Sequence, residues 1–201
     1  MPTEHPGKDD RRVRRTRAAL REALVALIVE RGWDGFSVQD LCQRADVGRS
    51  TFYMHFADKE EVLGGAFADL GRELRGQLAR SGAARPLGFS IGLFQHAQEH
   101  LTVFRAWVGR RSSHIVQGKM RDLVLELVRE DLARLLPSGS RRDGVAAFLA
   151  GALFELLIWS LEAKPPTTAG AADALFQELA APVLAAARSP GAPGPGPSGA
   201  R

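Results

Sequence analysis

Apolar residues recur at helical spacing along most of the chain. In the segment from Arg12 to Arg31, leucine and isoleucine stand at positions i, i+4, i+7 and i+8, on one face of a helix. The same spacing predicts further helices over 37–45, 49–56, 58–78, 87–98, 101–108, 113–135, 141–163 and 171–188, separated by turn residues. No segment keeps a period-two alternation of apolar and polar residues. The pattern therefore predicts an all-α protein.

Two of these helices are short and adjacent. Ser37 opens the first, with Asp40 placed to complete a capping box, and Asp46-Val47-Gly48 ends it. Two short helices joined by a tight turn are typical of a helix-turn-helix, whose second helix can lie in the major groove of DNA. The apolar side chains that would fix their crossing are Val38, Leu41, Ala45, Val47, Phe52 and Phe56.

The second short helix carries polar side chains between its inward-facing residues. Those able to bind bases or phosphates are Arg49, Ser50, Thr51, Tyr53 and His55. A helical hairpin with only a structural role would rarely have so many hydrogen-bonding side chains on so short a helix. Arg49 can form two parallel hydrogen bonds with guanine. The segment therefore favours sequence-specific binding to double-stranded DNA.

Basic residues concentrate ahead of this motif, although the formal net charge of the chain is only +4. They are Lys8, Arg11, Arg12, Arg14, Arg15, Arg17 and Arg21. Such a cluster suits nucleic acid or an anionic membrane, and it also occurs on helices that only face water. Beside a helix-turn-helix it favours the DNA backbone.

The stretch from about Arg12 to Phe67 resembles the DNA-binding domain of the TetR family of regulators. Its most specific part is Thr51-Phe52-Tyr53-Met54-His55-Phe56-x-x-Lys59-Glu60, similar to the family's T-L-Y-x-H-F-x-x-K-E. The resemblance implies contacts with bases or the sugar-phosphate backbone from Ser37, Gly48, Arg49, Ser50, Thr51, Tyr53, His55 and Lys59. Asp46, Gly48 and Met54 depart from the family's usual glycine, serine cap and aromatic residue, but none removes a DNA-binding donor beyond the cap.

The composition of the two ends and the resemblance of the part between them together predict four parts of the chain. Residues 1–10 form a flexible arm, and residues 11–67 form the DNA-binding domain, with the helix-turn-helix at about 37–56. Residues 68–188 form a helical domain for ligand binding and dimerisation. Residues 189–201, rich in proline, glycine and alanine, form a disordered tail.

The predicted helix near 145–161 is apolar on nearly every side. Such a helix must be covered all round, either by a second copy of the chain or by its own subunit. The predicted dimer interface comprises Phe148, Ala152, Leu156, Trp159, Leu175, Leu179 and Val183. A two-fold homodimer would place two recognition helices on a palindromic operator.

The C-terminal part also offers residues that could line a pocket for a hydrophobic small-molecule effector. They are Phe89, Phe94, His96, His100, Phe104, Trp107, Met120 and Phe148. An effector that prefers a conformation with the wrong spacing of recognition helices would release a repressor from its operator. The alternative is that most of these side chains are ordinary core.

Two other classes of function stay open. His96-Ala-Gln-Glu99-His100 matches the H-x-x-E-H pattern of zinc peptidases, so a zinc-dependent hydrolase is one alternative. A zinc peptidase also needs a third protein ligand for the metal, and nothing in the sequence marks which residue would supply it. A non-enzymatic helical dimerisation or carrier module is the other. The leading interpretation, a DNA-binding regulator, predicts no catalytic residue, metal or cofactor.

The single cysteine, Cys42, excludes an intrachain disulfide and fits a reducing compartment. Its helical spacing from apolar neighbours predicts a small buried core residue. The longest apolar stretch, Val145 to Leu161, carries Glu155 and is flanked by charge, which argues against a membrane span. We therefore expect a cytoplasmic protein without a membrane partner.

Overall fold

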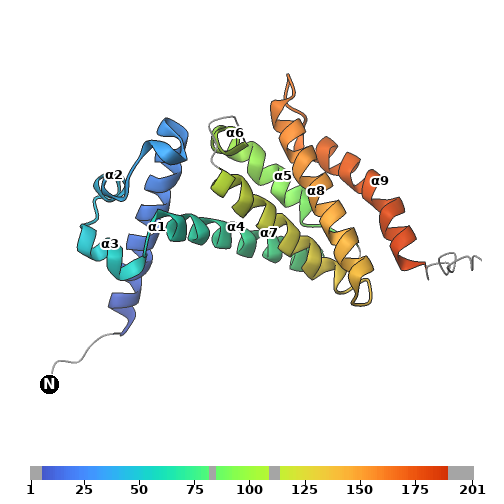
Figure 1. Ribbon diagram of the computed structural model, residues 1–201, viewed down its shortest axis with the longest axis horizontal. Helices are drawn as coiled ribbons and strands as arrows, with labels where there is room; N and C mark the ends of the chain where they lie inside the picture. Colours follow the sequence, from blue (N-terminus) through green and yellow to red (C-terminus); the bar gives the residue numbers. More distant parts are fainter. Residues whose placement is uncertain (1–5, 82–84, 109–113, 190–201) are drawn as a thin grey trace, which may run out of the picture.

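The computed structural model describes residues 6–81, 85–108 and 114–189, and every regular element in these ranges is helical (Figure 1). The N-terminal elements are α1 (Pro6–Arg31), the short 3-10 turn η1 (Trp33–Gly35), α2 (Val38–Arg44) and α3 (Arg49–His55). The others are α4 (Lys59–Ser81), α5 (Ser90–Glu99), α6 (Leu101–Val108), α7 (His114–Leu132), α8 (Ser140–Glu162) and α9 (Ala169–Arg188). The all-α prediction is confirmed.

Two helices cross the predicted limits between the parts of the chain. Helix α1 begins at Pro6, inside the segment predicted as an arm. Proline is favourable at the first helical position because its missing N–H would have no partner there. Helix α4 crosses the predicted domain limit at 67/68 without a break, so one helix belongs to both parts. Residues 1–5 of the arm and 190–201 of the tail lie outside the described residues.

Local hydrogen bonds explain where the short helices begin. The Ser37 hydroxyl accepts from the Asp40 N–H (3.2 Å), while the Asp40 carboxylate accepts from the Ser37 N–H (2.8 Å), so the predicted capping box is present. Asp58 similarly accepts from the Glu61 N–H at 2.8 Å ahead of α4. Between α2 and α3, Asp46 has a φ of 52°, the left-handed conformation that favours glycine.

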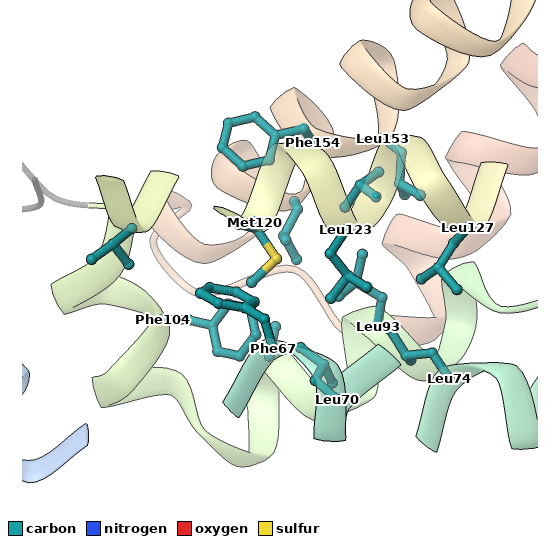
Figure 2. Packing of buried hydrophobic residues seen from close by; sticks show 14 of the residues in the cluster. Phe67, Leu70, Leu74, Leu93, Phe104, Met120, Leu123, Leu127, Leu153 and Phe154 are labelled. Carbon is teal, nitrogen blue, oxygen red and sulfur yellow. The ribbon is translucent and has the colours of Figure 1, made fainter. Parts of the chain in front are cut away.

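One continuous core joins the helices. Cys42 is buried in it, as predicted, beside Leu41 and Phe52. In the larger part, α4 supplies Phe67, Leu70 and Leu74 to a layer that also contains Phe104 of α6, Met120 of α7 and Leu153 of α8 (Figure 2). Figure 1 shows α1–α3 at one end and α5–α9 at the other, with α4 running between them. A shift of α4 would therefore be felt at both ends.

Helix α8 is long and apolar enough to span a membrane by length and composition, but helices at the centre of a soluble core pass the same test. It packs between α7 and α9, and buries Leu149, Leu153 and Leu157 against them. On its other side Phe148 and Trp159 stay exposed, by 61% and 48%. Helix α8 thus serves the core and leaves an apolar face uncovered.

Candidate nucleic-acid interface

Helix α3 is fixed to the rest of the protein by two phenylalanines. Phe52 is fully buried and Phe56, just after the helix, is nearly so; their ring centroids lie 6.0 Å apart. The Phe56 N–H closes the helix on the Phe52 carbonyl at 2.9 Å. Because Phe52 occupies the inward face of so short a helix, the side chains on the opposite face point outward.

The outward face of α3 carries three of the predicted DNA-binding side chains. Arg49 and Ser50 are exposed, and Tyr53 is 53% exposed. The Arg49 guanidinium lies 6.0 Å from the centroid of the Tyr53 ring, so the two form one polar and aromatic surface. Met54, 71% exposed, belongs to the same surface. Sequence reasoning left Met54 out, although a position two after the buried Phe52 must lie far from the inward face.

Three further predicted residues are partly engaged within the protein. Thr51, in the first turn of α3, and His55, its last residue, are half-buried. The Ser37 hydroxyl donates to the Asp40 carboxylate at 2.5 Å. This hydroxyl can donate to a phosphate only after its hydrogen bond to Asp40 is broken. Hydrogen bonds from the Ser37 hydroxyl, and next from its N–H, lower the pKa of Asp40 to about 2. Gly48 precedes α3 without a side chain to cap it.

Lys59 lies deeper than the sequence suggests. Its ammonium group donates to the backbone carbonyls of Trp33 (2.7 Å) and Phe36 (2.9 Å), and it stands 4.7 and 4.5 Å from the centroids of their rings. Burial lowers the pKa of the Lys59 amine, and the carboxylate of Asp34 opposes this effect. Two of the three N–H donors are thus used inside the domain, which leaves one for phosphate.

The basic residues of α1 extend this surface. Arg11, Arg12, Arg14 and Arg15 are exposed, and the Arg17 guanidinium lies 5.7 Å from the centroid of the Phe56 ring. Arg17 and His55 line a hollow of about 720 Å³ between α1, the end of α3 and α4. Arg21 instead pairs with Asp69 of α4. The side chain of Lys8 lies outside the described residues. Positive charge therefore continues from α3 along α1.

The residues predicted to form a dimer interface lie on α8 and α9, which pack against each other. Phe148, Trp159 and Leu179 are the large exposed apolar side chains of this pair, and Leu179 is 55% exposed. The others are half-buried: Ala152, Leu156, Leu175 and Val183. The structure thus leaves part of the predicted interface open to solvent on the two last helices.

The candidate effector residues that the structure describes differ in burial. Phe89, Phe94, Phe104 and Met120 are buried in the core, whereas Phe148 is exposed on α8. The side chain of Trp107 lies outside the described residues. A hollow of about 580 Å³ with a largely apolar wall lies elsewhere, between α1, α4 and α6, beside Val25, Val29 and Val103. The effector pocket stays a prediction.

His96, Glu99 and His100 come together at the end of α5. One ligand atom of each lies within 4.8 Å of the others. His96 is half-buried, and burial, helped by the charge of His100, lowers the pKa of its imidazole. The cluster lines neither of the two hollows just described, and a zinc hydrolase is not favoured by the fold.

Comparisons with known proteins agree with this geometry. Residues 20–66 match the family of bacterial regulatory proteins called the tetR family. A curated relative, the uncharacterized HTH-type transcriptional regulator YxbF of Bacillus subtilis (strain 168), is 42% identical over 55 residues. The match covers 27% of this chain and only 14% of that protein.

Most of the chain also has the fold of solved TetR-type regulators. A TetR transcriptional regulator from Streptococcus agalactiae 2603V is 21% identical with a TM-score of 0.66, over 88% of this chain and 99% of that one. Thermus thermophilus FadR, a TetR-family repressor solved with lauroyl-CoA, is 21% identical with a TM-score of 0.53, over 90% and 99%. Residues 20–66 are therefore similar to the tetR family of bacterial regulatory proteins, and most of the chain shares its fold with these solved regulators.

Proposed function

We propose that this protein is a homodimeric repressor that binds a palindromic operator in double-stranded DNA and is released from it by a small-molecule effector. The proposal includes a cytoplasmic location and no enzymatic activity. It extends the similarity over residues 20–66 to the activity of the whole chain.

The observation that carries the proposal is the outward face of α3. Arg49, Ser50 and Tyr53 stand exposed on a helix whose inward side is held by Phe52, and the exposed arginines of α1 lie beside it. A rigid short helix can enter the major groove, where Arg49 can bind guanine at its O6 and N7 atoms. The basic face of α1 would neutralise phosphates, so that affinity falls steeply with salt.

The uncovered face of α8 and α9 supports the dimer. Phe148, Trp159 and Leu179 are exposed apolar side chains on these two helices, and a second copy of the chain could bury them. A two-fold interface uses the same patch on both subunits and would set the two α3 helices about 34–36 Å apart, one turn of DNA.

Release by an effector is supported by the shared helix α4. Its buried residues contact the C-terminal core, while its first residue, Lys59, holds η1 and the start of the helix-turn-helix. A ligand that moves α4 would alter the spacing of the two α3 helices. The solved Thermus thermophilus relative holds lauroyl-CoA, which is consistent with a hydrophobic effector here. Titration calorimetry with hydrophobic compounds tests this step, and a compound that binds must lower operator affinity.

The DNA-binding step is tested by selecting bound duplexes from a random pool and measuring affinity for the selected duplex and for random DNA. Arg49→Ala should lose about 1–3 kcal/mol on the selected duplex and little on random DNA. Arg129→Ala, which removes an exposed arginine of α7, is the matched control and should keep both affinities. Equal losses for Arg49→Ala on both DNAs would contradict base recognition by this residue. Absence of salt-dependent DNA binding in the wild-type protein would contradict the proposed function.

A further inference from the structure

The His96, Glu99 and His100 cluster has a fourth neighbour that the sequence could not reveal. Glu73 lies on α4, and its Oε2 atom is 3.8 Å from the Nδ1 atom of His96 on α5. The distance is longer than a hydrogen bond, and Glu73 is about half exposed. A carboxylate from one helix therefore faces an imidazole of the next, beside two more metal-ligating groups.

The three residues at the end of α5 are spaced as ligands of one ion. Positions i, i+3 and i+4 share a helix face, and the ring centroids of His96 and His100 are 4.5 Å apart. Bond lengths of about 2.0–2.2 Å place tetrahedral zinc ligands roughly 3.3 Å from one another. The present separations of up to 4.8 Å can close by side-chain rotation, because Glu99 and His100 are exposed.

We propose that His96, Glu99 and His100 bind a divalent transition-metal ion of the Zn²⁺ type, with Glu73 of α4 orienting His96. Two imidazoles and one carboxylate suit Zn²⁺, whereas Mg²⁺ and Ca²⁺ require oxygen ligands. When the metal takes the Nε2 atom of His96, the Nδ1–H of the same ring donates to Glu73, an arrangement common around zinc. The fourth position is left to water.

The site would tie α5 to α4, and here the inference rests on the proposed function. Helix α4 begins at Lys59, directly after α3, and Glu73 lies farther along the same helix. A metal that fixes His96 against Glu73 favours one position of α4 over others. Because α4 holds the helix-turn-helix, metal binding would change operator affinity by linkage.

The metal site is tested first without DNA, by equilibrium dialysis of the full, tag-free chain against Zn²⁺ in the presence of excess Mg²⁺. We expect one Zn²⁺ per chain in the wild type and loss of this ion in the double variant His96→Ala/His100→Ala. His114→Ala, which removes an exposed histidine at the start of α7, is the control and should bind as the wild type does. Glu73→Gln should bind 10- to 100-fold more weakly.

The site is refuted if the wild type takes up no Zn²⁺, or if the double variant, shown to be folded by circular dichroism, retains it. An unchanged affinity in Glu73→Gln refutes the role of Glu73. The regulatory step is tested with the selected duplex, where Zn²⁺ should change the affinity of the wild type by about 5- to 150-fold and leave the double variant unchanged. Zn²⁺ binding without any change in DNA affinity refutes the coupling through α4. Failure to bind DNA at all refutes the proposed function, while dialysis still decides the metal site.

Discussion

The Lys59 ammonium group has a structural role inside its domain and a proposed role in binding phosphate. Replacing Lys59 by methionine tests the structural role. Methionine keeps a long apolar side chain next to the rings of Trp33 and Phe36 but has no N–H donor. The carbonyls of Trp33 and Phe36, which accept from Lys59 at 2.7 and 2.9 Å, would each lose a charged donor. The change therefore weakens the connection between η1 and the start of α4.

The magnitude follows from these contacts. A hydrogen bond from a charged donor contributes about 1.5–3 kcal/mol net, and because Lys59 is only half-buried we use the lower value for both bonds. Their loss gives about 3 kcal/mol. The ammonium also lies close to two aromatic rings, and each such contact is worth roughly 0.5–1 kcal/mol at a partly exposed site. We expect the free energy of unfolding to fall by about 4–5 kcal/mol.

Urea denaturation followed by circular dichroism measures this loss, at one protomer concentration because a dimer's stability depends on it. Lys119→Met is the matched control: its ammonium pairs with Glu60 at 3.5 Å, a partly exposed contact worth about 0–1 kcal/mol. If Lys59→Met loses no more stability than Lys119→Met, the structural role assigned to Lys59 is wrong. The third N–H of Lys59, which is proposed to contact phosphate, is tested by measuring DNA affinity of Lys59→Met at several salt concentrations. Loss of one phosphate contact should lower the salt slope by about one unit.

Three further outcomes follow from other parts of the structure. Trp159→Glu on α8 should convert the dimer to monomers, as measured by light scattering after size exclusion. Met54→Glu on α3, another exposed apolar position, is the control and should leave the protein dimeric. A dimeric Trp159→Glu variant would argue against the α8–α9 interface. Asp46→Gly should raise the free energy of unfolding by about 0.5–1 kcal/mol, because glycine adopts the φ of 52° without strain, and a loss of stability would contradict this explanation. The pKa of Asp40 is lowered from 3.8 to about 2 in the folded protein, so the stability that the ionised carboxylate contributes is complete above pH 4 and is lost as the pH falls toward 2. The difference in stability between wild type and Asp40→Asn should therefore shrink over this window. A constant difference would contradict the capping box.

The local features of the helix-turn-helix were predictable because their partners are close in sequence. The capping box joins residues three apart, and the turn at Asp46 follows from the two short helices on either side. The inward position of Phe52 follows from helical periodicity. Interactions of this range depend on backbone geometry that each segment carries by itself.

Other features could not be predicted from the sequence because they involve residues that are distant along the chain. Lys59 fits a phosphate-binding position by its place in the motif, yet two of its donors go to carbonyls 26 and 23 residues away. Phe148 and Phe154 lie on the same apolar helix, but one is exposed on the α8–α9 face and the other is buried. Periodicity could not decide between them, because α8 is apolar on nearly every side.

The amino-acid sequence by itself determined the helical class, the helix-turn-helix and the outward side chains of α3, since these depend on spacing within short segments. Only the tertiary structure decided which face of α8 is uncovered, that Lys59 is held inside its domain, and that Glu73 stands beside His96. Each of these depends on how helices far apart in the chain pack together. A periodic pattern shows that a helix has an apolar face, but the neighbours that cover it are chosen by the fold as a whole.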